Sequence, residues 1–255
     1  MLGMNTILIT GASSGFGAAC ARRLASENTR LILLARSEGK LQALREELAP
    51  RCAGVLVYVC DMQDREAVLA LPDALPAEFA EVDLLLNNAG LALGTEPAQR
   101  AELEDWETMV DTNIKGLMRL THALLPGMVQ RNRGHIINIG STAASWPYPG
   151  GNAYGGTKAF VQQFSRNLKA DLVGTAIRVS NIEPGMADTN FSKTRFKGDQ
   201  SKADAVYAGT QSLRAEDIAD TVHWVAHCPP HVNVNLVEIM PTCQAWAGWS
   251  VARKR

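Results

Sequence analysis

Short apolar runs alternate along this chain with longer segments in which apolar residues recur at helical spacing. Seven runs have the length of strands: residues 6–10, 31–35, 55–59, 82–86, 135–139, 177–182 and 232–240. Five segments have a helical period: residues 17–26, 39–48, 103–124, 153–172 and 216–227. Strands that are apolar throughout are covered on both faces, and strand–helix alternation implies parallel pairing. The pattern predicts an α/β fold, a doubly wound seven-stranded parallel sheet with helices on both faces.

Length and charge limit the class of protein further. The chain has 255 residues, of which 46% are hydrophobic and 20% charged, and we expect one domain over residues 1–255. Its formal net charge of −1 gives no basic surface for nucleic acid. No apolar run reaches the roughly 18 residues of a membrane span, and the first residues lack the positive charge of a signal peptide. We therefore expect a cytoplasmic protein.

Cysteines and histidines form no metal motif. The five cysteines are scattered without a C-x-x-C pair, which favours buried free thiols. His223 and His227 lie four residues apart on a predicted helix, but the pattern lacks the glutamate of H-E-x-x-H, and Pro229 and Pro230 precede His231. We expect no metal site.

A glycine-rich turn follows the first predicted strand and opens the first helix. Residues 10–17 read Thr-Gly-Ala-Ser-Ser-Gly-Phe-Gly. Glycines let a pyrophosphate approach a helix N-terminus, where free N–H groups favour an anion. The G-x-x-x-G-x-G spacing differs from G-x-G-x-x-G, so a purely structural turn is the alternative. The position after the first strand favours dinucleotide binding by Gly11, Ser13, Ser14, Gly15, Phe16 and Gly17.

The ends of the next strands indicate which dinucleotide binds. A carboxylate after the second strand would grip a free ribose 2′-hydroxyl, but here Arg36 and Ser37 follow, which favours the 2′-phosphate of NADP. The alternative is that Arg36 is solvated. Asp61, followed by Met62 in the predicted cofactor site, could accept the adenine amino group or merely cap a turn. Asn88 lies where the cofactor must pass.

Four polar residues could carry acid–base chemistry. Tyr154 and Lys158 share one face of a predicted helix, Ser141 follows the fifth strand, and Asn113 interrupts an apolar helical stripe. Reduction of a carbonyl requires a proton donor, and a free tyrosine with a pKa near 10 is a poor acid–base at neutral pH. An ammonium about 4 Å away is worth about 4 kcal/mol at an effective dielectric near 20, or about three pKa units before solvation losses. We expect Lys158 to lower the pKa of Tyr154 in this way, while Ser141 binds the substrate oxygen.

These motifs together resemble the short-chain dehydrogenase/reductase family. The resemblance rests on the glycine turn, Asn87-Asn88-Ala89-Gly90, Asn113, Ser141, Tyr154-x-x-x-Lys158 and Pro184-Gly185-x-x-x-Thr189. It implies a Rossmann fold and a catalytic tetrad of Asn113, Ser141, Tyr154 and Lys158, with Asn113 binding a relay water. It also implies a homotetramer and cofactor contacts from Tyr154, Lys158, Pro184, Gly185 and Thr189.

Within that family the chain resembles the bacterial NADP-dependent 3-hydroxy acid dehydrogenases, also described as L-allo-threonine or serine dehydrogenases and malonic semialdehyde reductases. Segments 88–94, 139–148, 182–185, 195–199 and 238–241 carry this likeness. One departure is Ser37, where the group often has a second arginine, and it weakens the NADP preference without reversing it.

Residues 186–205 form a long polar segment without a clear pattern, which we expect to be a substrate loop. A 3-hydroxy acid needs a cation beyond Tyr154, and Arg195 is our candidate because its guanidinium suits a carboxylate; Lys193 and Lys197 are alternatives. A solvent-facing basic loop is the competing interpretation. Residues 241–255 contain two tryptophans and are expected to form an oligomerisation tail.

The favoured function is NADP-dependent oxidation or reduction of short 3-hydroxy acids such as L-serine, L-allo-threonine and 3-hydroxyisobutyrate. Alternatives are a reductase of another ketone, a steroid or a 3-oxoacyl thioester, and a non-catalytic NADPH-binding sensor. A sensor could dispense with Tyr154 and Lys158, so their presence beside Ser141 argues against it.

Overall fold

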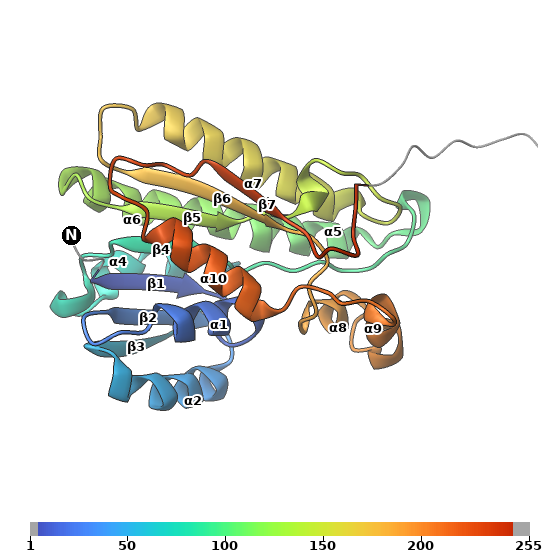
Figure 1. Ribbon diagram of the computed structural model, residues 1–255, viewed down its shortest axis with the longest axis horizontal. Coiled ribbons are helices and arrows are strands. Elements are labelled where there is room, and N and C mark those ends of the chain that lie inside the picture. Colours follow the sequence, from blue (N-terminus) through green and yellow to red (C-terminus); the bar gives the residue numbers. More distant parts are fainter. Residues whose placement is uncertain (1–4, 247–255) are drawn as a thin grey trace, which may run out of the picture.

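The computed structural model describes residues 5–246 and contains one seven-stranded sheet, as predicted (Figure 1). The strands are β1 (Thr6–Thr10), β2 (Arg30–Ala35), β3 (Gly54–Val59), β4 (Leu84–Asn87), β5 (His135–Ile139), β6 (Arg178–Pro184) and β7 (Leu236–Ile239). Their order is β3-β2-β1-β4-β5-β6-β7, and every pair is parallel. The predicted fold class is confirmed.

Helices connect the strands and cover both faces of the sheet. The α-helices are α1 (Gly15–Leu24), α2 (Glu38–Leu48), α3 (Arg65–Leu69), α4 (Leu71–Ala74), α5 (Leu103–Val110), α6 (Leu117–Gln130), α7 (Asn152–Asp171), α8 (Phe191–Arg195), α9 (Gln200–Tyr207) and α10 (Ala215–Ala226). A π-helical turn, η4 (Asp111–Gly116), joins α5 to α6. Short 3-10 turns are η1 (Ala49–Arg51), η2 (Ala77–Phe79), η3 (Ala98–Arg100) and η5 (Thr142–Ala144).

Two apolar layers hold the sheet between its helices. Alternate strand residues point to opposite faces, so Ile7 and Ile9 pack with α1, α2 and α10, whereas Leu8 packs with α4, α6 and the end of α7. All three side chains are at most 1% exposed, and burying each contributes about 1.5–3 kcal/mol relative to exposure. Burial on both faces explains why the strands are apolar throughout rather than alternating.

The strand order places the binding crevice. The chain moves from β1 outward through β2 to β3, then returns to the other side of β1 to form β4. Helices after β1 and after β4 therefore lie on opposite faces, which opens a crevice at the carboxyl ends of these two strands. The glycine turn follows β1 and Asn88 follows β4, so both lie at this crevice.

Three segments differ from the sequence prediction. The expected single helix 103–124 is two helices joined by η4, and Leu103, assigned to the buried stripe, is 59% exposed because it begins α5 at the surface. The expected substrate loop 186–205 contains α8 and the start of α9, in which Ser192 and Ala203 are buried. The expected strand 232–240 pairs only over Leu236–Ile239.

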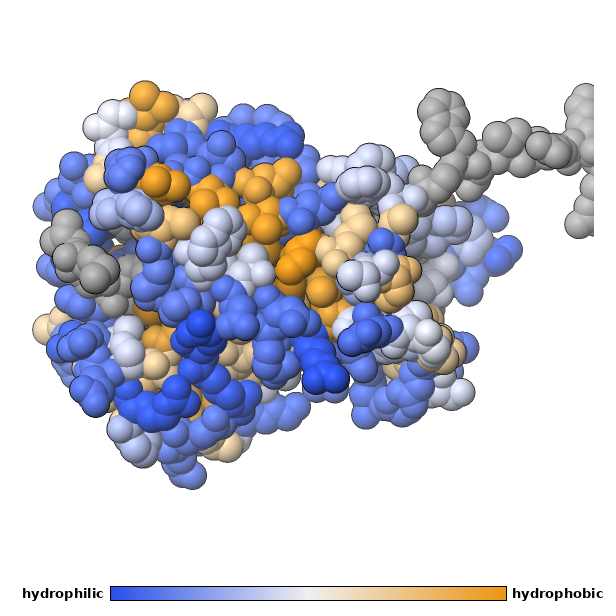
Figure 2. All heavy atoms as spheres, viewed as in Figure 1, coloured by the Kyte–Doolittle hydropathy of each residue, from blue (hydrophilic) through white to orange (hydrophobic). Residues whose placement is uncertain are grey.

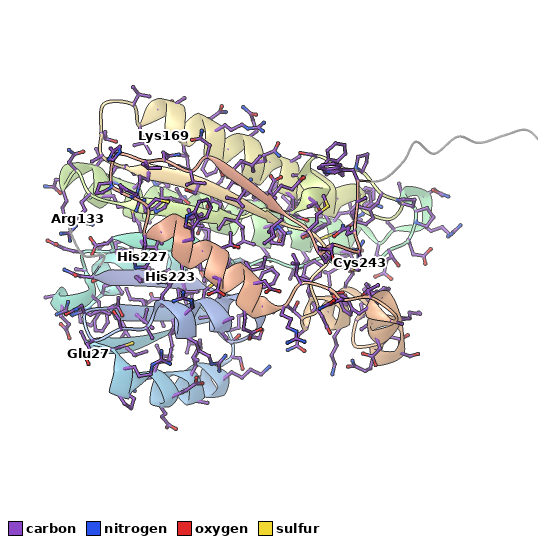
Figure 3. All side chains as sticks on the ribbon, viewed as in Figure 1. Glu27, Arg133, Lys169, His223, His227 and Cys243 are labelled. Atoms are coloured by element: carbon purple, nitrogen blue, oxygen red, sulfur yellow. The ribbon has the colours of Figure 1, made fainter. Side chains whose placement is uncertain are left out.

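Side chains outside the crevice show no metal centre. The rings of His223 and His227, at the end of α10, stack with centroids 4.1 Å apart, and Cys243 is an exposed thiol at a distance from them (Figure 3). Within residues 5–246 no three His, Cys, Asp or Glu side chains are grouped to hold a metal ion. None of the helices in this range is both long and apolar enough to span a membrane.

Candidate active site

A cavity of about 660 Å³ lies at the carboxyl ends of the strands, within the range of small-molecule sites. It brings together residues predicted from distant parts of the chain. The predicted site residues that line it are Gly11, Ser13, Ser14, Gly15, Phe16, Arg36, Ser37, Asp61, Met62, Asn88, Ser141, Tyr154, Lys158, Pro184, Gly185, Thr189 and Arg195. Gly17 and Asn113 do not line it; both lie directly behind it, as described below.

The glycine turn requires glycine, because a side chain at these positions would be strained or would overlap neighbouring atoms. Gly11 and Gly15 have φ angles of +65° and +51°, in the left-handed region that favours glycine. A Cβ on Gly17 would overlap the carbonyl oxygen of Gly11, and a Cβ on Gly11 would lie 2.9 Å from Asn88 Nδ2. The bare backbone at the N-terminus of the ten-residue α1 is therefore open to a ligand, and this geometry fits a dinucleotide pyrophosphate.

Hydrogen bonds connect the carboxyl ends of β1 and β4. Thr10 Oγ1 accepts from the backbone N–H groups of Asn88 and Ala89, both at 2.9 Å, while Asn88 Nδ2 donates to the Thr10 carbonyl at 2.8 Å. These three bonds satisfy polar groups that would otherwise be buried without partners. They therefore fix the relative position of these two strand ends, which border the cavity.

The far end of the cavity carries the residues predicted to select the cofactor. Arg36 Nη1 lies 3.7 Å from Asp61 Oδ2, and Asp61 Oδ1 also accepts from the N–H of Gln63 at 3.0 Å. Asp61 therefore caps a turn, and it also lines the cavity, so its contact with an adenine stays a prediction. Ser37 precedes α2 with its side chain making no capping bond. Lys40, which the sequence analysis missed, lines the same end one helical turn later.

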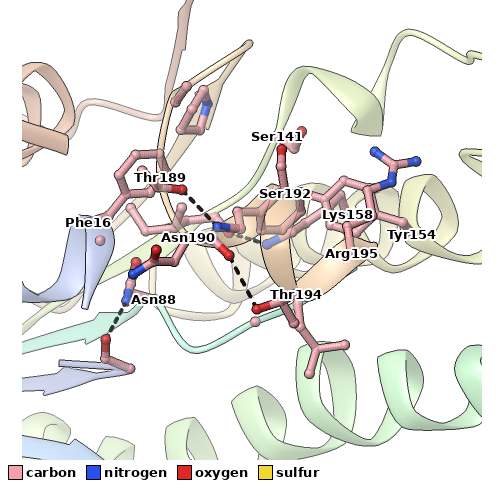
Figure 4. Close-up of a pocket in the computed structure, with 18 of the residues that line it drawn as sticks. Phe16, Asn88, Ser141, Tyr154, Lys158, Thr189, Asn190, Ser192, Thr194 and Arg195 are labelled. Atoms are coloured by element: carbon pink, nitrogen blue, oxygen red, sulfur yellow. Dashed lines mark hydrogen bonds between the residues drawn. The ribbon is translucent and has the colours of Figure 1, made fainter. Parts of the chain in front are cut away.

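Tyr154 and Lys158 lie on one face of α7, as their spacing predicts, and are only 9% and 7% exposed (Figure 4). Lys158 Nζ donates to the carbonyl of Ile139, the last residue of β5, at 2.8 Å. The ammonium lies 5.8 Å from the centre of the Tyr154 ring. Ser141 follows β5 and is oriented by an N–H of Ala143, which donates to its Oγ at 3.1 Å.

Burial controls the protonation of this pair. It raises the pKa of Tyr154 above its ordinary value of 10, and the opposing effects come from Ser141, by hydrogen bonding, and from the charge of Arg195. Burial also lowers the pKa of Lys158 from 10.5 to about 8. Our expectation that the ammonium lowers the pKa of the phenol is therefore not met, because desolvation of the buried phenol is the largest effect on this pKa. The phenol is protonated at neutral pH.

Asn113 lies in the π-helical turn and binds the loop after β4. Its Oδ1 accepts from the N–H of Leu91 at 2.9 Å, and its Nδ2 donates to the Leu91 carbonyl at 2.8 Å and to Thr157 Oγ1 at 3.1 Å. A Cβ added to Gly90 would lie 3.2 Å from Asn113 Oδ1 and 3.5 Å from Lys158 Nζ. Asn113 Oδ1 and Lys158 Nζ therefore both lie close to Gly90.

The sequence analysis missed Glu183, the residue before Pro184 on β6. Its side chain is fully buried, and Oε1 accepts from Gln162 Nε2 at 2.9 Å and from Asn181 Nδ2 at 2.7 Å. Its Oε2 has no hydrogen-bond partner among residues 5–246, and burial raises the pKa of this carboxyl. The negative charge of Glu183 raises the pKa of Lys158 and so opposes part of the lowering that burial causes. An isolated glutamate in a strand gives no sequence signal for this role, which depends on the neighbouring strand and helix.

The basic residues of segment 186–205 that we considered for the substrate carboxylate differ in whether they line the cavity. Arg195 lines the cavity; its guanidinium lies 5.1 Å from the centre of the Tyr148 ring and donates to the carbonyls of Gly94 and Gly150 at 3.3 Å. Figure 4 shows it close to Tyr154. Of our two alternatives, neither Lys193 nor Lys197 lines this cavity. Aromatic neighbours that we had not predicted, including Tyr148, Phe191 and Trp246, complete the lining.

Comparison with known proteins agrees with this geometry. The family model described as short chain dehydrogenase matches residues 5–200. The chain belongs to the short-chain dehydrogenase family. It is 55% identical over 248 residues to an NADP-dependent 3-hydroxy acid dehydrogenase of Salmonella typhi, covering 97% of this chain and 99% of that protein.

Two further relatives of this short-chain dehydrogenase are informative. Sulfoacetaldehyde reductase 2 of Chromohalobacter salexigens is 51% identical over 248 residues, covering 97% of this chain and 98% of that one. A solved structure, the closed form of serine dehydrogenase complexed with NADP+, superposes with a TM-score of 0.94 at 52% identity, covering 98% of this chain and all of that chain.

We predict that Glu183→Gln changes the pH dependence of alcohol oxidation. Removing the negative charge disfavours the Lys158 ammonium, so the pKa of Lys158 falls below about 8. Because oxidation needs the neutral amine as proton acceptor, the acidic limb of kcat/KM moves to lower pH. Glu238→Gln is the control, because Glu238 pairs with Glu183 across the strands but binds the indoles of Trp146 and Trp246. An unmoved limb in Glu183→Gln would show that this carboxylate does not act on Lys158.

Proposed function

We propose that this protein is an NADP-dependent dehydrogenase of short 3-hydroxy acids, which it interconverts with 3-oxo acids. One observation carries the substrate assignment: the guanidinium of Arg195 shares a cavity with Ser141, Tyr154 and Lys158. A carboxylate bound at Arg195 would hold a hydroxyl two carbons away near the phenol of Tyr154. Guanidinium–carboxylate pairing is charge-assisted and fixes orientation as well as affinity.

The cofactor assignment rests on the glycine turn and on the far end of the cavity. NADP, when bound, supplies the hydride acceptor or donor. The open backbone at Gly11 and Gly15 suits its pyrophosphate, and Arg36, Ser37 and Lys40 offer two cations and a hydroxyl for a 2′-phosphate. Lys40 compensates for the arginine that Ser37 replaces. The 3-hydroxy acid dehydrogenase and serine dehydrogenase relatives, whose names specify NADP, support this choice.

The side chains of the tetrad divide the proton chemistry between them. In reduction, Ser141 donates a hydrogen bond to the carbonyl oxygen as negative charge develops, and Tyr154 then donates its phenolic proton. Lys158, with a pKa of about 8, can release a proton near neutral pH to restore the phenol. Asn113 holds a water from which Lys158 is recharged, consistent with its place beside Gly90. Oxidation uses the same groups in reverse.

A further relative supports an anionic substrate. Sulfoacetaldehyde reductase is named for an aldehyde that carries a sulfonate, and it shares half of its residues with this chain. A sulfonate, like a carboxylate, can accept two parallel hydrogen bonds from a guanidinium. Short sulfonate-bearing aldehydes are therefore a second candidate substrate class for the same pocket.

We predict that purified protein with NADP+ oxidises L-serine, L-allo-threonine, 3-hydroxyisobutyrate or 3-hydroxypropionate faster than neutral alcohols of the same length.

Arg195→Met should raise KM for the acids by about 10–100-fold, since a hydrogen bond to a charged group is worth about 1.5–3 kcal/mol. Lys193→Met, on the same helix outside the cavity, is the control. Faster turnover of a neutral ketone, a steroid or a 3-oxoacyl thioester would overturn the substrate class, and no turnover despite NADP binding would favour the sensor.

We predict that Tyr154→Phe lowers kcat/KM by about 10²–10⁴-fold, the usual contribution of an acid–base group, because the phenolic proton is lost. NADP+ should still quench the fluorescence of tryptophans such as Trp246, which lines the cavity. Initial rates and fluorescence titration separate the two effects. Retained activity in this variant would remove Tyr154 from its assigned role.

We propose that the chain assembles as a homotetramer through the free edge of the sheet. Figure 2 shows an apolar band on the face that carries β7 and α10, and Leu236 on β7 and Trp224 on α10 are 41% and 56% exposed. Of the predicted tail, the structure describes residues 241–246, in which Trp246 donates to Glu238 on β7; Trp249 lies outside the described residues. Light scattering should give about 110 kDa, four chains of 27.5 kDa, and a smaller mass for Leu236→Asp. A monomeric wild-type protein would contradict the proposal.

A further inference from the structure

Residues 187–213 form a lid beside the cavity that is joined to the rest of the protein by a narrow neck. The backbone N–H of Asp188 donates to the carbonyl of Leu213, and the N–H of Leu213 donates to Met186. Figure 1 shows α8 and α9 projecting beyond the carboxyl ends of the strands. The lid is joined to the rest of the protein by a single bridge. Its position over the site therefore depends on contacts at the opposite end of the lid, its tip.

The tip of the lid contacts the loop after β4 through Arg195. The N–H of Gly94 donates to the Arg195 carbonyl at 3.0 Å, and Arg195 Nε donates back to the Gly94 carbonyl at 3.3 Å. Phe191, on the same helix, lies 5.5 Å from Tyr154 between ring centroids. The position of the lid tip therefore fixes where the proposed substrate cation lies.

Lys197, two residues after Arg195, makes an ion-pair cluster with the start of α5. Its Nζ lies 2.7 Å from Glu102 Oε2 and 2.9 Å from Asp105 Oδ2. The Asp105 side chain is only 14% exposed, and a Cβ on Gly94 would lie 3.3 Å from its Oδ2. Asp105 therefore contacts the same loop that Arg195 binds, which places the ion pair next to the guanidinium anchor.

The backbone at Lys197 also indicates a role for its side chain. It has a φ of +52° at the end of α8, where the N–H groups of Lys197 and Gly198 bond back to Thr194 and Lys193. Glycine and asparagine adopt this left-handed conformation most easily. A lysine here accepts an unfavourable backbone, and its ammonium is thereby directed onto two carboxylates.

We propose that Lys197 is a positioning residue: its ion pairs with Asp105 and Glu102 close the lid and hold Arg195 where it binds the acid group of the substrate. The inference rests on the proposed function, since it assigns Arg195 to that group. Lys197 itself does not touch the substrate, because it does not line the cavity. It affects binding of the acid rather than the proton chemistry at Tyr154.

The test is Lys197→Asn, which keeps a residue suited to the left-handed backbone and removes the charge. KM for the preferred hydroxy acid and the inhibition constant of propionate, an unreactive carboxylate, should both rise by about fivefold or more. The kcat at saturating acid, KM for a neutral alcohol of the same length and the dissociation constant of NADP+ should not change. The melting temperature should fall by no more than about 4 °C, as for loss of a surface ion pair in a chain of this size.

The matched control is Lys202→Asn, the same change in the same lid. Lys202 Nζ lies 3.4 Å from Asp199 Oδ2, so this pair lies within the lid and does not fasten it. Asp105→Asn should reproduce part of the effect of Lys197→Asn, since Glu102 still pairs with Lys197 in that variant. The double variant should be little worse than Lys197→Asn alone, because the Lys197–Asp105 contact is already absent there. Additive effects would contradict a shared ion pair.

The possible failures are distinguishable. If the wild-type protein does not prefer acids to neutral alcohols, the proposed function fails, and the inference fails with it. If acids are preferred but Lys197→Asn matches the wild type, or if Lys202→Asn raises KM equally, the inference alone is wrong. A fall in kcat with unchanged KM would likewise place Lys197 outside substrate positioning.

Discussion

Everything proposed for the site depends on a lysine amine that is buried at the end of a strand. Lys158 Nζ donates to the carbonyl of Ile139, which ties the middle of α7 to the carboxyl edge of β5. The same bond fixes Tyr154, one turn earlier on α7, beside Ser141, two residues beyond Ile139. Burial lowers the pKa of the amine to about 8. A group that is both rigidly held and close to half-protonated near neutral pH is suited to exchanging protons.

The sequence predicted the fold and most of the cavity for one physical reason. Parallel strands all end at the same edge of a sheet, so residues that follow different strands converge although they are far apart in the chain. Gly11 follows β1, Asn88 follows β4, Ser141 follows β5, and Gly185 follows β6. Placing apolar runs as strands was therefore sufficient to place these residues together.

Features that depend on packing could not be predicted in this way. The pKa of Tyr154 is raised because its phenol is buried, and Phe191, a residue remote in the sequence, contributes to its surroundings. An ion-pair argument for Tyr154 and Lys158 at a fixed separation cannot give the size of this desolvation, which here exceeds the expected lowering of the pKa of Tyr154. The buried Glu183 and the ion pairs of Lys197 also depend on partners brought by other elements. Spacing along the chain does not predict these contacts.

The most direct test of the account is the pKa of Lys158, measured by NMR titration of protein labelled with ¹³C at the lysine Cε, with the signal assigned by its loss in Lys158→Met. The account predicts a midpoint near 8 in the absence of cofactor, well below the ordinary lysine value. A midpoint near the ordinary value of about 10.4 would contradict it, because the amine would then be too solvated or too strongly paired to supply protons at neutral pH.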